Sequence, residues 1–326
     1  MLRVKRRSSS FNTQRINDIY QDIHDRNNNL FLHYGDLTDF TSILNIIKKV
    51  KPNEIYNLAA QSHVQVSFET PEYTANADAL GTLRILEAIK ILNLTKKVKF
   101  YQASTSEMYG SSPPPQNENT PMHPASPYGA AKLYAHWITK NYRTSYNIFA
   151  STGILFNHEG PSRGETFVSR KITMGIANIL KGKQKLIYLG NLDAYRDWGD
   201  ARDYVEAMWK ILQLKKPDDF VIATGKSYSV RSFVEIAFLI VGIKIKWRGK
   251  GLNEVGFDQK TNKILIKIDK KYFRPQEVDH LRGNYNKAKK MLNWSPKIKF
   301  EKMIEDMLKN DLEKLNFSFD QFIKNK

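Results

Sequence analysis

Short apolar blocks alternate with longer segments of helical periodicity over the first two thirds of the chain. The blocks have the length and the β-branched and aromatic content of buried strands. They lie at residues 1–7, 31–34, 54–58, 98–103, 148–155, 186–189 and 220–223. The helical segments lie between them, at residues 38–50, 72–93, 127–146, 166–180 and 201–214. This alternation predicts an α/β fold with a doubly wound parallel sheet.

Beyond residue 181 the predicted elements become shorter and mixed. Strands are expected at residues 243–247 and 264–268, and helices at residues 286–292 and 300–315. We therefore expect two domains. Residues 1–180 would form a Rossmann-like dinucleotide-binding domain, whose sheet is completed by segments around residues 186–224. Residues 181–326 would form mainly a smaller, mixed α/β substrate-binding lobe.

Polar residues with catalytic potential follow the strand expected at residues 98–103. Residues 102–110 read QASTSEMYG, and residues 126–132 read SPYGAAK at the start of a helical run. In open α/β sheets, ligands bind at the carboxyl ends of the strands. We therefore expect the hydroxyl groups and Glu107 of the first segment to lie on a loop at this edge.

Tyr128 and Lys132 are four residues apart, so they share one face of the expected helix. A lysine ammonium one turn from a phenol lowers the pKa of the phenol from its reference of about 10. A hydroxyl group from Thr105 can then position or relay the proton. The Y-x-x-x-K spacing alone is weak evidence for a catalytic pair, because such pairs are common on helix surfaces. Combined with the strand and the STSE sequence, it indicates acid/base chemistry.

Composition excludes several classes of protein. The chain has 326 residues, of which 41% are hydrophobic, and it has no cysteine. It therefore can bury a large core, and it lacks a thiolate metal site. No apolar run reaches the roughly 18 residues that a membrane helix needs, and we see no signal peptide. These features predict a cytoplasmic protein with no membrane partner.

The net charge of +18 is the one unusual value. It is consistent with a lysine-rich surface, with polyanionic small ligands such as nucleotide phosphates, or with nucleic acid. No recognised nucleic-acid motif accompanies the charge, so we expect no nucleic-acid partner.

The beginning of the chain departs from a dinucleotide-binding fold. Such folds open with a strand and a glycine-rich turn, which is absent here. In such folds, the residue that hydrogen-bonds the adenosine ribose follows the second strand. Arg6 and Arg7 occupy this position here. The chain is therefore expected to begin at the second strand of the fold. Arginine accommodates a 2′-phosphate, so Arg6 and Arg7, with Ser8 and Ser9 as donors, predict NADP. The alternative is a solvated basic tail.

Several segments together resemble the GDP-mannose 4,6-dehydratase family of extended short-chain dehydrogenases/reductases. The resemblance covers residues 6 to about 312. Its most specific segments are RRSSSFNT (6–13), LAAQSHV (58–64), QASTSEMYG (102–110), GILFNHE (153–159), FVSRK (167–171), LGNLD (189–193), RDWG (196–199) and YFRPQEV (272–278). The STSE and Tyr-Lys segments also occur in sugar-nucleotide decarboxylases, and the others favour the dehydratase.

The resemblance implies that GDP-mannose is converted to GDP-4-keto-6-deoxymannose, which feeds the synthesis of GDP-fucose or another GDP-deoxysugar. In that reaction C4 of the sugar is oxidised, water is lost across C5–C6, and the same hydride returns to C6. Tyr128 would take the C4 hydroxyl proton, supported by Lys132 and Thr105. Glu107 would remove the C5 proton and later protonate the departing hydroxyl group, and Ser106 is a weaker candidate for the C6 hydroxyl.

The resemblance also implies binding residues. Contacts to the cofactor are implied for Arg6, Arg7, Ser8, Ser9, Asp36, Leu37, Leu58, Ala59, Ala60, Gln61, Ser62, Tyr73, Lys132, His158 and Arg163. Contacts to the substrate are implied for Ser67, Ser106, Asn157, Val168, Lys171, Gly190, Arg196, Arg274 and Glu277. The guanidinium groups of Arg196 and Arg274 suit a pyrophosphate.

Structural interpretations of some of these residues stay open at this stage. His158 could be a packed core histidine, and Trp198 is expected in the core. Arg196 could pair with Asp197 or another neighbour, and Arg274 could be a surface residue.

Alternative functions also stay open. The first strand of such a fold is central, so its absence would leave two ladders unpaired and apolar residues exposed. We therefore expect poor NADP binding, or poor stability, in the chain as it stands. The alternatives are a related sugar-nucleotide epimerase or decarboxylase, and an inactive chain that only binds GDP-sugar. The resemblance implies a homodimer or homotetramer.

Overall fold

The structure is a computed structural model that describes residues 2–5, 12–20, 24, 29–274 and 276–319. Arg6, Arg7, Ser8 and Ser9, the predicted 2′-phosphate site, lie outside the described residues. The chain divides into two compact units, and each is described by itself below. Unit 1 comprises Met1–Ser104, Ser126–Gly153 and Ile211–Asp219, and unit 2 comprises the remaining segments. The predicted domain boundary at residue 181 stays a prediction.

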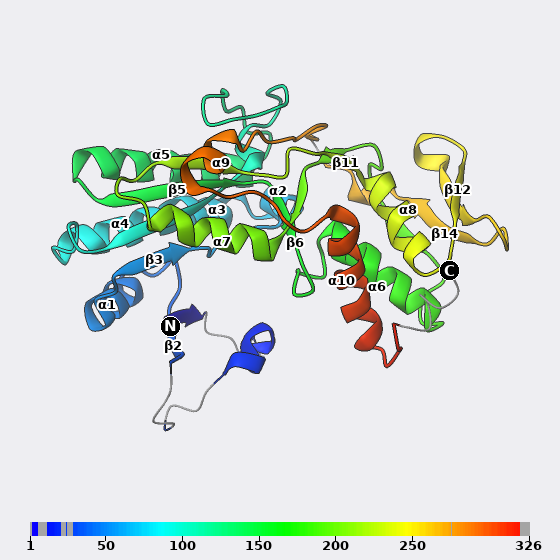
Figure 1. The fold of residues 1–326 in the computed structure, drawn as a ribbon, viewed down its shortest axis with the longest axis horizontal. Helices are drawn as coiled ribbons and strands as arrows, with labels where there is room; N and C mark the ends of the chain where they lie inside the picture. Colours follow the sequence, from blue (N-terminus) through cyan, green and yellow to red (C-terminus); the bar gives the residue numbers. More distant parts are fainter. Residues whose placement is uncertain (1, 6–11, 21–23, 25–28, 275, 320–326) are drawn as a thin grey trace. The chain divides into compact units, whose positions relative to one another are not determined.

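The main sheet has four strands in the order β10-β5-β4-β3. They are β3 (Glu54–Asn57), β4 (Lys99–Thr105), β5 (Phe149–Leu155) and β10 (Asp219–Ile222). β3 and β4 run parallel, with Glu54 opposite Lys99 (Figure 1). All four strands lie within one or two residues of their predicted positions, so the expected parallel α/β arrangement is present.

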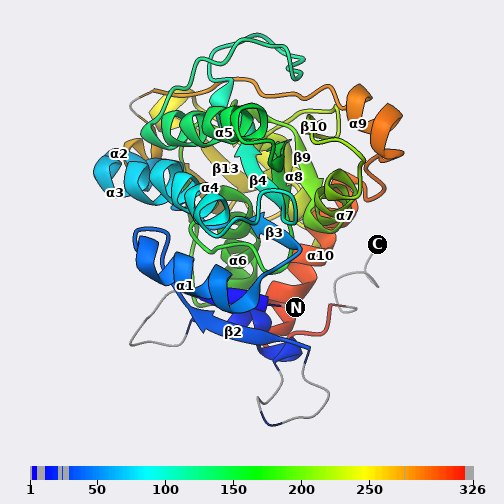
Figure 2. The ribbon, with the colours of Figure 1, turned by 90° about the vertical axis from the view of Figure 1, so that its left-hand side faces the viewer.

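Helices of unit 1 pack beside this sheet. They are α1 (Phe40–Val50), α4 (Gly81–Ile91) and α5 (Pro127–Ser145). α4 packs against both α1 and α5 (Figure 2). Their apolar faces form a core with the adjoining strands, which includes Ile47, Leu86, Ile89, Phe100 and Tyr142. The core fixes the position of α5, which carries Tyr128 and Lys132.

The first two strands form a separate parallel pair. β1 (Leu2–Lys5) pairs with β2 (Phe31–Tyr34), with Leu2 opposite Phe31. Among the described strands, neither β1 nor β2 joins the main sheet, in which β3 is an end strand. Phe31 and Tyr34 are 46% and 65% exposed. β1 and β2 thus form a sheet of their own among the described strands.

The helical run predicted at residues 72–93 is not one regular helix. It consists of α3 (Pro71–Thr74), a wider π-helical segment η2 (Ala75–Leu80), and α4. A short helix, α2 (Val64–Glu69), precedes it and was not expected from the sequence. His63 caps α2, because its Nδ1 accepts a hydrogen bond of 3.3 Å from the backbone N–H of Val66.

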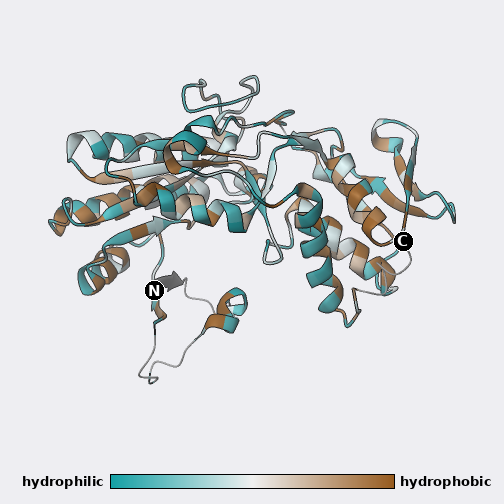
Figure 3. Cartoon of the chain, in the orientation of Figure 1, coloured by the Kyte–Doolittle hydropathy of each residue, from teal (hydrophilic) through white to brown (hydrophobic). Residues whose placement is uncertain are grey.

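Unit 2 contains a second four-stranded sheet in the order β12-β13-β14-β7. Its strands are β7 (Ile187–Leu189), β12 (Ile245–Arg248), β13 (Val255–Asp258) and β14 (Ile264–Ile268). α6 (Val168–Leu180), α8 (Val230–Ile240) and α10 (Phe300–Glu313) accompany it (Figure 1). The ribbons of these helices show hydrophobic residues in brown beside hydrophilic residues in teal (Figure 3). The apolar ones, such as Ile176, Phe233 and Met307, form one core with Trp198, which confirms the expected burial of Trp198.

Shorter elements connect these layers. They are η1 (Gln14–Ile19), η3 (Ser106–Met108), β6 (Asn157–Glu159), β8 (Tyr195–Arg196), β9 (Trp198–Asp200), α7 (Ala201–Leu212), β11 (Tyr228–Ser229), η4 (Gly251–Asn253), η5 (Lys270–Tyr272) and α9 (Asn286–Leu292). None of the helices in the described part of the chain is long and apolar enough to span a bilayer.

Candidate active site

The start of α5 holds Tyr128 and Lys132 in place. Ser126 caps the helix, because its Oγ accepts a hydrogen bond of 3.0 Å from the backbone N–H of Gly129. Pro127 occupies the first turn, where its missing N–H is not needed. Tyr128 and Lys132 are only 8% and 3% exposed. The predicted acid/base residues therefore lie, as expected, one turn apart on a well-capped helix, and both are buried.

Lys132 is a buried cation with a buried acid beside it. Burial lowers the pKa of Lys132, and the negative charge of Asp78 opposes this shift. Burial raises the pKa of Asp78 to about 6, opposed by Lys132 and by the backbone N–H of Gln61. Asp78 is 2% exposed and was not predicted from the sequence. The local signal was one carboxylate in the segment ANADAL, in which Asn76 is the other polar residue.

The loop after β3 carries predicted cofactor residues. The backbone N–H of Gln61 donates a hydrogen bond of 2.7 Å to Asp78 Oδ1, and the Gln61 side chain accepts one of 2.6 Å from the N–H of His63. Leu58 is 55% exposed at the end of β3, and Tyr73 is 36% exposed at the beginning of α3. The loop is thus fixed to η2 while apolar side chains of the predicted cofactor site stay open to solvent.

Thr105 is the last residue of β4, and Ser106 and Glu107 begin the single turn η3. The Thr105 Oγ1 accepts a hydrogen bond of 3.3 Å from the backbone N–H of Glu107. All three residues are less than one tenth exposed. The expected loop is thus a tight, buried turn at the strand end, which fixes the backbone from which the Glu107 side chain projects.

Predicted substrate residues form a row of alternating charges in unit 2. Arg196 Nη2 donates a hydrogen bond of 3.0 Å to Glu277 Oε1. Arg274 Nη1 lies 3.5 Å from the same oxygen and 3.8 Å from Glu107 Oε1. These distances bring together a proposed base and three residues predicted for the substrate.

The adjacent Asp197 is not the partner of Arg196 in this network. The Asp197 carboxylate instead accepts hydrogen bonds from the backbone and hydroxyl of Thr224 and from the N–H groups of Gly225 and Gly283. This buried anion organises the turn after β10.

Lys171 and Gly190 come together around Tyr272. The Lys171 ammonium lies 3.1 Å from the centre of the Tyr272 ring. Burial lowers the pKa of Lys171 to about 8, with Asp269 opposing this shift. A Cβ atom on Gly190 would lie 2.5 Å from the Tyr272 carbonyl oxygen, so this close approach requires glycine. These contacts place two of the predicted substrate residues in one cluster.

The remaining predicted substrate residues have simpler surroundings. Asn157 begins β6, and Val168 begins α6, where it is 37% exposed. Ser67 is fully buried, and its hydroxyl group donates a hydrogen bond of 2.6 Å to the carbonyl oxygen of Val64. The structure explains Ser67 as part of α2, and its contact with substrate stays a prediction.

His158 and Arg163 are packed residues of unit 2. His158 Nδ1–H donates a hydrogen bond of 2.9 Å to the Phe156 carbonyl oxygen, and its ring stacks on Tyr204. Burial lowers the pKa of His158. Arg163 pairs with Glu159 at 3.0 Å. These contacts support the structural interpretation of both residues, and their roles toward a cofactor stay predictions.

Asp36 and Leu37 lie between β2 and α1. Asp36 Oδ1 accepts hydrogen bonds from the N–H and the hydroxyl group of Thr38, at 3.0 and 2.9 Å. The Leu37 side chain packs so closely on Gly81 that a Cβ there would lie 2.7 Å from Leu37 Cβ. The turn that precedes α1 is therefore well defined, and the predicted contact with an adenine stays a prediction.

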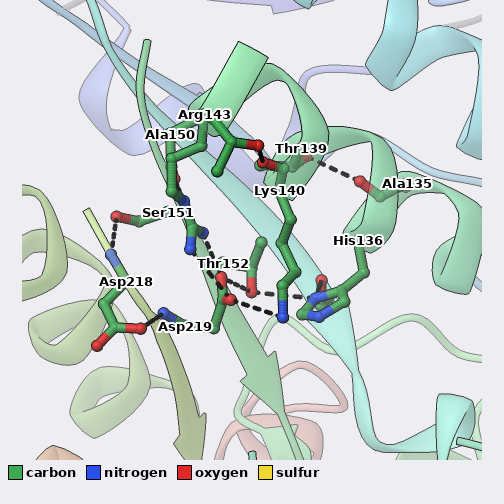
Figure 4. Close-up of polar contacts among 12 residues, drawn as sticks. Ala135, His136, Thr139, Lys140, Arg143, Ala150, Ser151, Thr152, Asp218 and Asp219 are labelled. Atoms are coloured by element: carbon green, nitrogen blue, oxygen red, sulfur yellow. Dashed lines mark hydrogen bonds and ion pairs between the residues drawn. The ribbon is translucent and has the colours of Figure 1, made fainter. Parts of the chain in front are cut away.

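A buried network of ion pairs and hydrogen bonds joins α5 to Thr152 of β5 and Asp219 of β10 (Figure 4). Asp219 pairs with Arg143 and, at 3.4 Å, with Lys140. Thr152 donates to Asp219 at 2.8 Å, so His136 Nδ1–H, 3.1 Å from Thr152 Oγ1, must be the donor in that pair. Burial raises the pKa of Asp219, but the cations hold it at about 2. Burial lowers the pKa of His136 to about 4. The sequence analysis did not predict this network.

The sequence is similar to that of one known protein family along most of its length. A family model described as GDP-mannose 4,6 dehydratase matches residues 1–307. A GDP-mannose 4,6-dehydratase of Sinorhizobium fredii is 58% identical over 313 residues, which cover 96% of this chain and 89% of that protein. The human GDP-mannose 4,6 dehydratase is 55% identical and covers 95% of this chain and 84% of its own length.

Solved structures of lower identity share the fold. The RMD protein of Pseudomonas aeruginosa, solved with NADPH, has a TM-score of 0.74 at 22% identity and covers 90% of this chain and 93% of that one. A dTDP-glucose 4,6-dehydratase of Bacillus anthracis, solved with NAD, has a TM-score of 0.76 at 21% identity and covers 97% and 89%. The fold is therefore that of Rossmann-type dehydratases and epimerases. Taken with the family match along most of its length, the chain belongs to the GDP-mannose 4,6-dehydratase family.

Proposed function

We propose that this chain converts GDP-mannose to GDP-4-keto-6-deoxymannose, with the reacting groups on α5 and on the turn after β4. The observation that carries the proposal is the buried Tyr128 and Lys132 pair at the capped start of α5, in a chain 58% identical to a GDP-mannose 4,6-dehydratase. The relatives do not favour the alternatives of an epimerase, a decarboxylase or an inactive GDP-sugar-binding chain.

Tyr128 acts as the base for the C4 hydroxyl group of the sugar. A phenol requires a nearby positive charge to lose its proton near neutral pH. Lys132 supplies that charge, because it lies one turn further along the same face of α5. Thr105 holds the C4 oxygen with its hydroxyl group, which is fixed at the end of β4.

Glu107 acts on C5 and C6 of the sugar. Once C4 is a ketone, the C5 proton becomes acidic enough for a carboxylate to remove it. The tight turn of η3 fixes the backbone of Glu107, and a proton transfer requires such a defined position. The carboxyl group then returns its proton to the departing C6 hydroxyl group, and Ser106 is a further donor to that hydroxyl group.

Arg196, Arg274 and Lys171 bind the GDP portion. Two guanidinium groups beside one carboxylate can exchange that carboxylate for phosphate oxygens, which arginine binds in a bidentate manner. Lys171, beside Tyr272 and Gly190, adds a third cation in the same unit. Glu277 then accepts hydrogen bonds from the nucleotide.

The reaction requires a nicotinamide cofactor, which accepts a hydride from C4 and returns it to C6. The described residues fit such a group, because the Lys132 ammonium makes no hydrogen bond among them and so has donors for a ribose, while Leu58 and Tyr73 offer open apolar surface. We propose NADP rather than NAD on the strength of Arg6 and Arg7.

A homodimeric or homotetrameric state and a cytoplasmic location stay predictions. The exposed aromatic residues Tyr134 and Trp137 of α5, 41% and 57% exposed, support a contact between copies of the chain.

The direct test is to incubate the purified chain with GDP-mannose and NADP and to measure the keto product by its absorbance in base and by NMR. Formation of GDP-4-keto-6-deoxymannose, with none from the Tyr128→Phe variant, is the expected result. An epimerised or decarboxylated sugar nucleotide, or no reaction by a chain that binds both ligands, would contradict the proposal.

A further inference from the structure

Asp78 is a carboxylate in an unusual place. It lies within the π-helical segment η2, and it is 2% exposed among apolar neighbours such as Ala77 and Ala79. One turn of π-helix inside a longer α-helix is rare, and such turns are frequent at functional sites. Neither the cofactor nor the substrate contacts that we propose use this side chain.

The two carboxylate oxygens of Asp78 have different surroundings. Oδ1 accepts a hydrogen bond of 2.7 Å from the backbone N–H of Gln61. Oδ2 is buried and accepts no hydrogen bond from the described residues. Since a buried carboxylate oxygen without a partner is unfavourable, the fold alone gives no reason for an acid at this position.

The charge that acts on Asp78 comes from α5. η2 packs against α5, and the electrostatic interaction of Asp78 is with Lys132. The nearby Arg84 of α4 faces elsewhere, because it donates to the carbonyl oxygens of Leu37 and Asn76. Gln61 contributes a backbone N–H, and its side chain bonds to His63. Lys132 is thus the charged partner of Asp78 within unit 1.

We propose that Asp78 is a positioning residue for Lys132, which keeps the lysine charged and aimed while the backbone of Gln61 holds the carboxylate. This proposal rests on the acid/base role proposed for Lys132. It explains why the chain keeps an incompletely bonded carboxylate in a buried helix. It also connects the loop after β3, which carries predicted cofactor residues, to the catalytic helix through one side chain.

The direction of each effect follows from the charges. Burial favours neutral Lys132, and the Asp78 anion opposes this, so removal of the anion lowers the pKa of Lys132 further. For Asp78 itself, the pKa of about 6 in the folded chain lies above the ordinary value of 3.8. Such a shift means that ionisation of the carboxylate destabilises the folded chain. The effect is absent below about pH 4, grows as pH rises from there, and is complete once pH has passed about 6.

The Asp78→Asn variant tests the proposal, because asparagine keeps the shape and can still accept from the Gln61 N–H. At pH 8 we expect the variant to unfold at a higher temperature than the wild type, and this difference to shrink as pH falls below about 6 and to vanish below about pH 4. We expect kcat to fall at least about tenfold, and the alkaline limb of its pH profile to move down by roughly one unit. Asp311→Asn is the matched control.

The control removes another buried carboxylate, which pairs with Arg170 at 2.7 Å in unit 2. It should leave the pH profile of kcat unmoved, because Asp311 pairs with Arg170 and not with Lys132. If Asp78→Asn has wild-type kinetics and an unchanged pH profile, the proposal is wrong. If it is less stable than the wild type, or does not fold, Asp78 is a structural residue, and the proposal is equally wrong.

A second measurement does not depend on turnover. The dissociation constant of NADPH is measured by fluorescence for the wild type, Asp78→Asn, Lys132→Gln and the double variant. The proposal requires that Asp78→Asn weakens binding in the wild type but has no effect once Lys132 is replaced. Additive effects would overturn it. If the wild type makes no keto product from GDP-mannose, the proposed function fails, while this cycle still decides whether Asp78 acts through Lys132.

Discussion

Arg196 donates a hydrogen bond of 3.0 Å to Oε1 of Glu277, and Nη1 of Arg274 lies 3.5 Å from the same oxygen. One carboxylate therefore faces two guanidinium groups. A phosphate group carries more acceptor oxygens than a carboxylate, so a diphosphate can engage both arginines at once. In the proposed complex, the diphosphate would displace Glu277 from at least one of the two guanidinium groups.

Arg274→Ala should weaken the binding of GDP. Loss of a charge-assisted hydrogen bond corresponds to about 1.5–3 kcal/mol, so we expect the dissociation constant to rise roughly 10- to 100-fold. Isothermal titration with GDP measures this. The matched control is Arg231→Ala, because Arg231 also pairs with two carboxylates, Asp193 and Glu254, in the same unit. Equal effects of both substitutions would mean that Arg274 does not bind the nucleotide.

Glu107→Gln should abolish turnover while GDP binding is retained. The amide keeps the shape of the side chain but cannot accept the C5 proton, and loss of a general base lowers kcat by about 10²- to 10⁴-fold. Turnover is measured as the absorbance of the keto product in base, and GDP affinity by titration. Full turnover by this variant would exclude Glu107 as the base. The Ser106→Ala variant, which changes the adjacent side chain, should retain most of the activity.

Asp219→Asn should destabilise the chain. Burial raises the pKa of Asp219, but Arg143 and other neighbours outweigh this effect and lower the pKa from its ordinary value of 3.8 to about 2. Its contribution is therefore present above pH 4 and is lost as pH falls toward 2. Replacing one partner of a buried pair lowers the free energy of unfolding by roughly 2–5 kcal/mol.

Denaturant unfolding at several pH values measures this contribution. The difference between wild type and Asp219→Asn should be constant from pH 5 to 7 and should shrink below pH 4. Asp218→Asn is a control on the adjacent residue, whose backbone N–H donates to Ser151 Oγ. A constant difference down to pH 2 would mean that the charge of Asp219 is not what stabilises the chain.

Much of the fold could be predicted because the strands are short apolar blocks in a regular alternation with helices. β14 at Ile264–Ile268 and α9 at Asn286–Leu292 have the bounds that the sequence indicated. α8 at Val230–Ile240 was missed, because most of its side chains are apolar and such a run does not distinguish a buried helix from a strand. The cap by Ser229 and the packing of its apolar side chains in the core stabilise the segment as a helix.

Some residues of the candidate site could likewise be predicted from the sequence, and others could not. Tyr128, Lys132 and Glu107 stand in short local motifs, and the sequence shows them directly. Asp78 and Asp219 could not be found, because their meaning depends on partners that are distant in the sequence; Asp219 and Arg143 are 76 residues apart. A regular helical pattern in the sequence also does not indicate that the helix becomes a π-helix at η2. That geometry depends on how the segment packs and not on its periodicity.

Lys171 should make nucleotide binding depend on pH. Burial lowers its pKa to about 8, so its ammonium is mostly charged at pH 7 and mostly neutral at pH 9. If the charged form binds GDP, the dissociation constant should rise by up to tenfold between these values. Lys171→Arg stays charged over the whole range, and its affinity should change much less. Lys171→Met should bind weakly at every pH. Any titration of GDP itself affects all three proteins alike. The difference between the pH dependence of the dissociation constant in the wild type and in Lys171→Arg therefore gives the contribution of the Lys171 titration. Parallel curves for wild type and Lys171→Arg would show that this lysine does not bind the nucleotide and that its place over the Tyr272 ring is structural.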